Sequence, residues 1–533
     1  MKIIINKYDL NPIILGAIFL LMILILNLDH VIDINNIKHW STFHRDDIVF
    51  IYNSLLYTEG LDQHHLDHPS LFTFIIFPFF YKLAYYFGYI EFFNLSGFLQ
   101  SQDFNISLSK LFFISRLVIQ LFSLATILII YKIIIKFSSR RIDSFLVTSF
   151  FIFSTGFTSA SNRIESGLIA VFFVLLAFYV FLKFIEKKDK QNMLYLILVF
   201  LLIFSGMMQK KIVYFVLPFL FLSSYMLLKK NNLKLYHYKI LDKLNINYKF
   251  LLLLIYLLAL FFISYRTIIN NIFFLNRDLD FIFLVLNYSG FNIIFYLYIK
   301  YFQNQYYRNL LTYNIIFAAT YFFYKYFLIY FFSAPVAVWS ISFTNFLGHL
   351  NMFVSGGDIV KSAFKFESLF LYAEVLIINL KNVFLKYFFS LSFQSVLVWI
   401  NLILFLLFFN KIKSKEKISI YALFLGFLFV QSVILFRYEQ DTYFLNSEFF
   451  LIFSLSICLK YLKFNLNYIF GSIAIITILL ISNISHYEMI KSGNNKSYCY
   501  SPMKPIENLT YYKYWTSKFP EAVISKLCKD INF

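Results

Sequence analysis

The residues best suited to chemistry are concentrated in one polar stretch of this chain, between positions 29 and 70. It holds seven carboxylates and six of the chain's nine histidines, whereas most acidic residues elsewhere are scattered singly among apolar runs. Carboxylates and imidazoles are the side chains that most often transfer protons and bind divalent cations. The stretch is therefore the predicted centre of an active site, and the rest of the chain must supply the residues that complete it.

Two of these carboxylates, Asp46 and Asp47, directly precede a short run whose apolar residues recur at helical spacing. Two interpretations are open. As charges at a helix N-terminus they would stabilise the helix by about 0.3 to 1 kcal/mol through its macrodipole. Beside a membrane surface, a partly desolvated carboxylate is also suited to act as general base on an acceptor hydroxyl or amine.

A second group follows at His64, His65, Asp67 and His68. These side chains could hold a divalent cation, but their spacing matches no specific metal pattern, and solvated loop histidines would look the same. Pro69 restricts His68 to an extended backbone, which fixes Asp67 and His68 at the start of the next apolar run. Asp67 and His68 are the expected ligands of any divalent metal ion, and no metal is expected to be obligatory.

The elements that must position these residues are membrane-spanning helices. The chain has 533 residues, of which 60% are hydrophobic and 14% charged, too apolar a composition for a soluble globule. Its apolar runs of about 18 to 22 residues are long enough to cross about 30 Å of hydrocarbon. The predicted fold class is an all-α polytopic membrane protein. In a membrane protein the net charge of +19 does not indicate nucleic-acid binding, and what matters is which loops carry the basic residues.

Fourteen apolar runs are candidates for these helices, and a weaker run at 368–385 is typical of an amphipathic surface helix. They lie at about 12–28, 71–90, 111–131, 145–162, 166–185, 193–208, 212–228, 250–265, 281–299, 310–332, 391–410, 418–436, 444–462 and 467–483. If 71–90 lies on the outer surface, the cytoplasmic loops hold 22 lysines and arginines against 6 in the short outer loops. We therefore expect about thirteen spans, with 71–90 as an outer juxtamembrane helix.

This topology places the polar regions on one side of the membrane. Residues 1–484 form one transmembrane domain with a first outer loop at 29–110 and a large outer loop at 333–390, and residues 485–533 form a small extracytoplasmic tail. Cys499 and Cys528 lie in this tail, where they could pair or remain two thiols. We expect a multi-pass protein of a bacterial plasma membrane with its active site on the extracytoplasmic side.

Further ionisable residues lie at the outer ends of the predicted spans, where charge is expected to be functional. Arg116, Lys210 and Arg437 are suited to bind a phosphate presented by a lipid, Arg through two hydrogen bonds and Lys as a point charge. Glu165 lies in a turn between two spans. The alternative for such residues is interface anchoring by snorkelling, and His349 in the large outer loop could equally be an ordinary solvated histidine.

The order of these features resembles the membrane-embedded glycosyltransferases of the C-type fold (GT-C) that use polyprenyl-phosphate sugars, a group that includes protein O-mannosyltransferases and lipid A aminoarabinose transferases. The matching elements are Asp46-Asp47, Asp67-His68-Pro69-Ser70, Arg116-Leu117, Arg163-Ile164-Glu165, Gly206 with Lys210 and Pro218, and Arg437-Tyr438 with Tyr443. They cover residues 1–230 and, loosely, 430–465. Asp47 replaces the usual Glu, Ser70 the second Pro, and Asn446 a common Pro, so no particular subgroup is implied.

The resemblance implies an inverting glycosyltransferase that moves a sugar from a polyprenyl-phosphate carrier to a lipid, glycan or protein acceptor at the outer membrane face. Its site residues are then Asp46 and Asp47 as general base, His68, Arg116, Lys210 and Arg437 at the donor phosphate, and Asp67, Glu165, Tyr443 and His349 in supporting positions. One alternative is a flippase or transporter of lipid-linked sugar, whose charges would line a path through the membrane. Another is a surface-polysaccharide polymerase, for which the 333–390 loop is large enough.

Overall fold

The computed structural model is helical throughout the part of the chain that it describes. This part comprises residues 10–26, 47–61, 70–101, 104–138, 140–186, 192–210, 212–227, 366–390, 392–435 and 441–462, with single residues between 316 and 324 and between 477 and 487. No strand occurs among these residues. The predicted spans at 250–265 and 281–299, and most of those at 310–332 and 467–483, lie outside them.

Every other predicted apolar run forms a helix. In chain order the helices are α2 (Asn11–Leu26), α5 (Asp47–Thr58), α6 (Leu71–Tyr86), α7 (Leu95–Leu99), α8 (Phe104–Ser138), α9 (Arg141–Ile152), α10 (Thr155–Asn162), α11 (Ser166–Glu186), α12 (Asn192–Met207), α13 (Val213–Ser223), the 3-10 turn η1 (Ser224–Leu227), α20 (Phe366–Phe389), α21 (Phe393–Leu407), α22 (Ser414–Ile434) and α23 (Asp441–Leu459). By length and composition, three of them could cross a membrane, or five if two bent pairs each count as one span. The total of thirteen spans stays a prediction.

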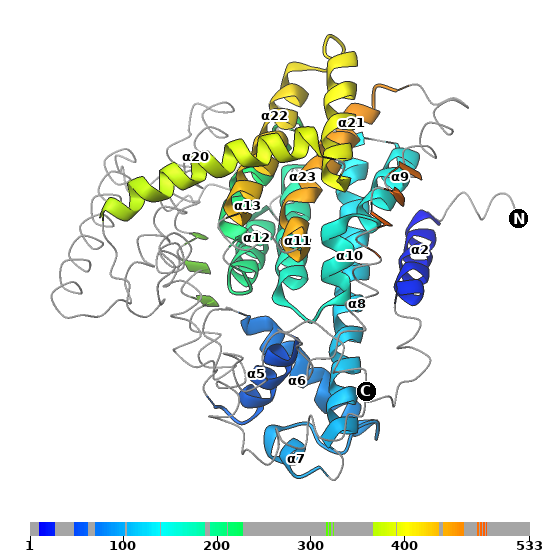
Figure 1. The fold of residues 1–533 in the computed structure, drawn as a ribbon, viewed down its shortest axis with the longest axis vertical. Helices are drawn as coiled ribbons and strands as arrows, with labels where there is room; N and C mark the ends of the chain where they lie inside the picture. The colour runs from blue at the N-terminus through cyan, green and yellow to red at the C-terminus, as the bar shows by residue number, and fades with distance from the viewer. Residues whose placement is uncertain are drawn as a thin grey trace, which may run out of the picture.

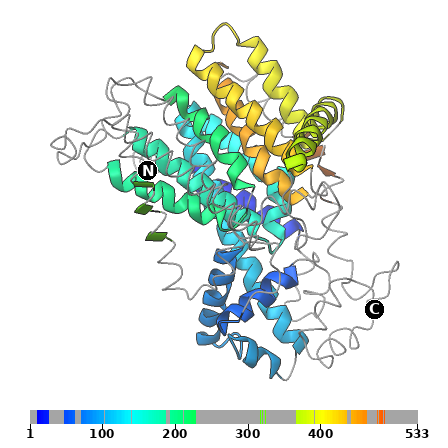
Figure 2. The same cartoon turned by 90° about the vertical axis from the view of Figure 1, so that its left-hand side faces the viewer.

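The longest helix, α8, joins two layers of the molecule. Its 35 residues extend over about 53 Å, well beyond the roughly 30 Å of a hydrocarbon core. Helices α5, α6 and α7 pack on its N-terminal part at one end of the molecule, apart from the main bundle (Figures 1 and 2). The 71–90 segment, which charge bias predicts to be juxtamembrane, is α6 in this layer. Which side of the membrane the layer faces stays a prediction.

Two predicted segments are bent. The run at 145–162, predicted as one span, is divided into α9 and α10, which meet at 60°. The weak run at 368–385 forms α20, which lies across α22 and meets α21 at 82° (Figure 1). The first bend was not predicted from the sequence, because the mean hydropathy of the whole run stays high although Ser154 and Gly156 interrupt it.

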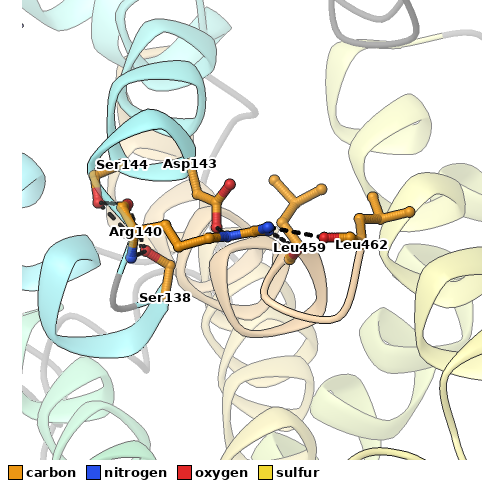
Figure 3. A network of polar contacts seen from close by, with 6 residues as sticks. All are labelled: Ser138, Arg140, Asp143, Ser144, Leu459 and Leu462. Carbon is orange, nitrogen blue, oxygen red and sulfur yellow. Dashed lines mark hydrogen bonds and ion pairs between the residues drawn. The ribbon is translucent and has the colours of Figure 1, made fainter. Parts of the chain in front are cut away.

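A polar network at the far end of α8 connects three helices (Figure 3). The guanidinium group of Arg140 donates to Asp143 Oδ2 at 2.6 Å, to the Leu462 carbonyl at 2.8 Å and to the Leu459 carbonyl. The side chain of Asp143 is fully buried. Because the last carbonyls of a helix lack intrahelical partners, Arg140 attaches the start of α9 to the end of α23.

Candidate functional site

One of the two predicted general-base residues, Asp47, lies where α5 begins. Asp47 is the first residue of α5, which places its charge at the positive end of the helix macrodipole. Three apolar residues on one side of this helix, Ile51, Leu55 and Leu56, are buried and hold it in place. The carboxylate itself is 1% exposed, and its Oδ1 accepts a hydrogen bond of 3.1 Å from the Ile164 N–H. Asp47 is therefore a buried anion joined to a turn 117 residues further along the chain.

Arg116 is the cation opposite this carboxylate. Its Nη2 lies 3.8 Å from Asp47 Oδ2, and its guanidinium group lies 5.3 Å from the centre of the Phe112 ring. Arg116 lies three residues, less than one turn, before the last twenty residues of α8, about the length that spans a bilayer. The Asp47–Arg116 ion pair therefore lies where this part of α8 meets the α5–α7 layer.

A second ion pair joins the next residue of the same turn to α12. Glu165 Oε2 lies 3.8 Å from Lys210 Nζ, and both side chains are at most 15% exposed. Glu165 Oε1 is buried and has no hydrogen-bond partner among the described residues. Since Ile164 binds Asp47 and Glu165 pairs with Lys210, two consecutive residues connect the two ion pairs into one site.

Lys210 is also stacked on an aromatic ring. Its Nζ lies 4.3 Å from the centre of the Tyr443 ring, close enough for a cation–π interaction. The Lys210 backbone N–H donates to the Gly206 carbonyl at 3.1 Å, which continues the turn at the end of α12 as far as Lys210. The ammonium group of Lys210 has three N–H donors, and neither the ring nor a carboxylate oxygen at 3.8 Å takes up all of them, so donors are available to an anionic ligand.

Gln209 connects this turn to α6. Its side-chain oxygen accepts hydrogen bonds from the Phe72 and Thr73 N–H groups at 3.2 and 3.5 Å, and its Nε2 donates to Thr73 Oγ1 at 3.0 Å. It therefore caps α6 in place of Ser70, whose buried hydroxyl makes no hydrogen bond to the described residues. The cap therefore holds the start of α6 next to the turn that carries Lys210.

Gly167 leaves the room that the second ion pair needs. A Cβ atom on Gly167 would lie 2.8 Å from Glu165 Oε1 and 3.0 Å from Lys210 Nζ, both shorter than ordinary contact. Only a residue without a side chain therefore allows these two groups their present positions. Sequence reasoning missed Gly167 and Gln209. Their neighbours Glu165 and Lys210 drew attention through charge, and an uncharged residue beside them gives no comparable signal.

The structure brings together five of the predicted site residues, namely Asp47, Arg116, Glu165, Lys210 and Tyr443. Five others, Asp46, Asp67, His68, His349 and Arg437, lie outside the described residues. Within the described part of the chain, no group of three or more His, Cys, Asp or Glu side chains could hold a metal ion. The expected ligands Asp67 and His68 are not in that part, so the metal site stays a prediction.

Comparison with known proteins adds two solved structures. No family model matches the chain, and no curated protein matches it in sequence. An oligosaccharyltransferase of Archaeoglobus fulgidus, crystallised with zinc and sulfate, is similar with a TM-score of 0.41 and 11% identity, over 98% of this chain and 57% of that one. The oligosaccharyltransferase AglB of the same archaeon, in complex with an inhibitory peptide and a dolichol-phosphate, is similar with a TM-score of 0.41 and 12% identity, over 97% of this chain and 60% of that one. The chain thus spans less than two thirds of either structure's length.

Proposed function

We propose that this protein is an inverting glycosyltransferase that moves a sugar from a polyprenyl-phosphate carrier to a lipid, glycan or protein acceptor at the outer face of the membrane. The observation that carries the proposal is the joining of two ion pairs, Asp47–Arg116 and Glu165–Lys210, through one turn, which we place at the level where α8 leaves the bilayer. A carboxylate is what an acceptor needs for deprotonation, and buried cations are what a leaving phosphate needs for charge compensation.

The contacts of Asp47 decide which role we assign to each of the two neighbouring carboxylates. Asp47 is committed to Arg116 and to the Ile164 N–H, so we assign it the positioning of the α5 N-terminus. Asp46, the residue before it, is the proposed general base. It takes the proton of the acceptor O–H or N–H as that oxygen or nitrogen attacks the anomeric carbon. The bond from this carbon to the phosphate oxygen breaks, and the phosphate leaves with the electron pair.

The cations stabilise that leaving charge. Lys210 and Arg116 are both almost fully buried, and a charge–charge interaction in a water-poor site is much stronger than in bulk water. His68 and Arg437 are proposed as further phosphate ligands, with Asp67, Tyr443 and His349 in supporting positions. A polyprenyl phosphate is a stable anion when it leaves, so the proposal requires no metal, and a divalent ion bound by Asp67 and His68 would add to the same charge compensation.

The test is sugar transfer in proteoliposomes that contain a radiolabelled polyprenyl-phosphate hexose or pentose and extracted envelope acceptors. Asp46→Asn should lower the rate of transfer by about 10² to 10⁴, the usual contribution of a general base, while binding of polyprenyl phosphate stays unchanged. Full turnover in both Asp46→Asn and Asp47→Asn would contradict the proposal. Movement of intact lipid-linked sugar between leaflets, with no label on any acceptor, would identify a flippase instead.

A further inference from the structure

The break between α9 and α10 interrupts the backbone hydrogen bonds of a predicted span. Helix α9 ends at Ile152 and α10 begins at Thr155, with a bend of 60° between them. A broken helix leaves N–H and C=O groups without intrahelical partners, and in hydrocarbon these must be satisfied by other parts of the protein. The partners at this break therefore show what holds it.

The N–H side of the break is held by a buried carboxylate of α23. The Gly156 N–H donates to both oxygens of Glu448, at 3.0 and 3.1 Å, and Gln394 Nε2 of α21 donates to Oε1 at 2.7 Å. Glu448 is completely buried. Ser154 caps the same turn by accepting from the Phe157 N–H at 3.3 Å.

The carbonyl side is held by the C-terminal part of the chain. The Phe153 carbonyl accepts from Asn483 Nδ2 at 2.7 Å and from the Tyr487 hydroxyl at 2.9 Å. Thr155 Oγ1 in turn donates to Asn483 Oδ1 at 2.8 Å. Both sides of the break are thus satisfied by residues about 300 positions away, so the break is a specific structure and not a weak point.

At this break α10 touches the backbone of α23. A Cβ atom on Gly156 would lie 2.1 Å from the Leu445 nitrogen and 2.7 Å from Glu448 Oε2, distances that no side chain allows. The Gly156–Glu448 contact therefore fixes how far α10 can slide along α23. Six residues of α10, about 9 Å, separate Gly156 from the turn that carries Ile164 and Glu165. On the other helix, Tyr443 precedes Glu448 by little more than one turn.

We propose that Glu448 is a positioning residue of the candidate site: through α10 it sets the position of the turn whose Ile164 N–H binds Asp47 and whose Glu165 faces Lys210. The inference rests on the proposed function for its effect on sugar transfer, but not for its effect on the turn. An ionised side chain within a membrane-spanning bundle is costly. The carboxylate fits these contacts, because Oε1 accepts from both Gly156 and Gln394 and Oε2 accepts from Gly156 as well, whereas a glutamine would place its N–H₂ group against the Gly156 N–H in either orientation of the amide.

The different hydrogen-bonding groups of a carboxylate and an amide can be tested by exchanging the residues at positions 448 and 394. E448Q keeps the size of the side chain but places its N–H₂ group, a donor, against the Gly156 N–H. The double variant E448Q/Q394E restores the pattern, since the new amide accepts from Gly156 with its oxygen and donates to the new carboxylate with its nitrogen. Gln431→Leu is the matched control. Gln431 is an equally buried amide that donates to the Tyr387 hydroxyl of α20 at 2.6 Å and accepts from Ser447 of α23 at 2.7 Å.

The primary readout does not use activity. An R163C substitution places a thiol in the half-buried turn itself, and its rate of alkylation by N-ethylmaleimide is followed at that site by mass spectrometry in the full-length protein. E448Q should raise this rate about five- to tenfold, as expected for the loss of a buried hydrogen bond that holds the turn. E448Q/Q394E should return it to within about twofold, and Gln431→Leu should leave it unchanged although it lowers thermal stability.

Sugar transfer is measured on the same variants without R163C. It should fall about tenfold or more in E448Q, in line with a displacement of reacting groups by a fraction of an ångström, and recover in the exchange variant. Unchanged alkylation in E448Q, an equal rise in Gln431→Leu, or a folded exchange variant that is not restored would each overturn the inference. If alkylation follows the expected pattern but the wild type transfers no sugar, the proposed function fails and the role of Glu448 in placing the turn stands.

Discussion

Replacing Gly167 with alanine should lower activity without lowering stability. Gly167 is the second residue of α11 and has no unusual backbone conformation, so alanine fits the helix and should stabilise it by up to about 1 kcal/mol. The added Cβ atom, however, enters the space of the Glu165–Lys210 ion pair. An oxygen at 2.8 Å must move by about 0.6 Å, and a nitrogen at 3.0 Å by about 0.4 Å, to reach the 3.4 Å of an ordinary contact.

The size of the effect follows from these displacements. Both atoms are at the ends of flexible side chains, so they can move at little cost in stability. Since a misplacement of 1 Å can lower a rate by about 10²-fold, a shift of half that size should lower kcat/KM for transfer by about tenfold, or about 1.4 kcal/mol. The affinity for polyprenyl phosphate should change in parallel, because Lys210 is the group that moves.

The assay combines transfer in proteoliposomes with the apparent unfolding temperature of the purified protein. Gly16→Ala is the matched control, because Gly16 also lies in an apolar helix and its Cβ atom would meet only Leu124 at an ordinary 3.8 Å. Activity of Gly167→Ala within twofold of the wild type, at equal or higher stability, would refute the view that the Glu165–Lys210 spacing matters for the reaction. A large fall in stability would show instead that the backbone moved.

Three more outcomes follow from contacts in the structure. Lys210→Met should weaken binding of polyprenyl phosphate about 10- to 100-fold, the value of a charge-assisted contact. Lys183→Met, in the last turn of α11, should leave the affinity unchanged although Lys183 stacks on Tyr179 in a similar way. Titration with polyprenyl phosphate, followed by native mass spectrometry, measures both affinities. Gln209→Ala should cost about 1 to 2 kcal/mol as a lost cap, and hydrogen exchange of the first amides of α6 should accelerate. Arg140→Ala should lower the free energy of unfolding by about 3 kcal/mol because the buried Asp143 loses its cation, yet polyprenyl-phosphate affinity should stay the same; a loss of affinity there would contradict the assignment of the site to the α5–α7 end.

Much of the helical framework follows from local properties of the sequence. Apolar runs predict helices because only an intrahelical hydrogen-bond ladder satisfies the backbone in lipid. Each run within the described residues is helical, although the run at 145–162 is divided into two helices. The start of α5 at Asp47 also follows, since the apolar residues behind it have helical spacing. The count of thirteen spans and the side of the membrane rest on charge bias, and they stay predictions.

The details of the site depend on contacts between distant segments, which local patterns do not contain. Charge alone identified Arg116, Glu165 and Lys210 as candidates, because isolated ionisable residues at span ends are costly unless they are used. The division of one apolar run into α9 and α10 could not be found in this way. It is held by Glu448 and Asn483, and only the folded chain brings these residues to Gly156 and Phe153.

The most direct measurement is a cryo-electron microscopy structure of the protein in nanodiscs with an added polyprenyl phosphate. The account predicts phosphate density beside the Tyr443 ring, with a phosphate oxygen about 3 Å from Lys210 Nζ, the length of a charge-assisted hydrogen bond, and near Arg116. A phosphate bound elsewhere, with Lys210 Nζ still 3.8 Å from Glu165 Oε2, would contradict the account.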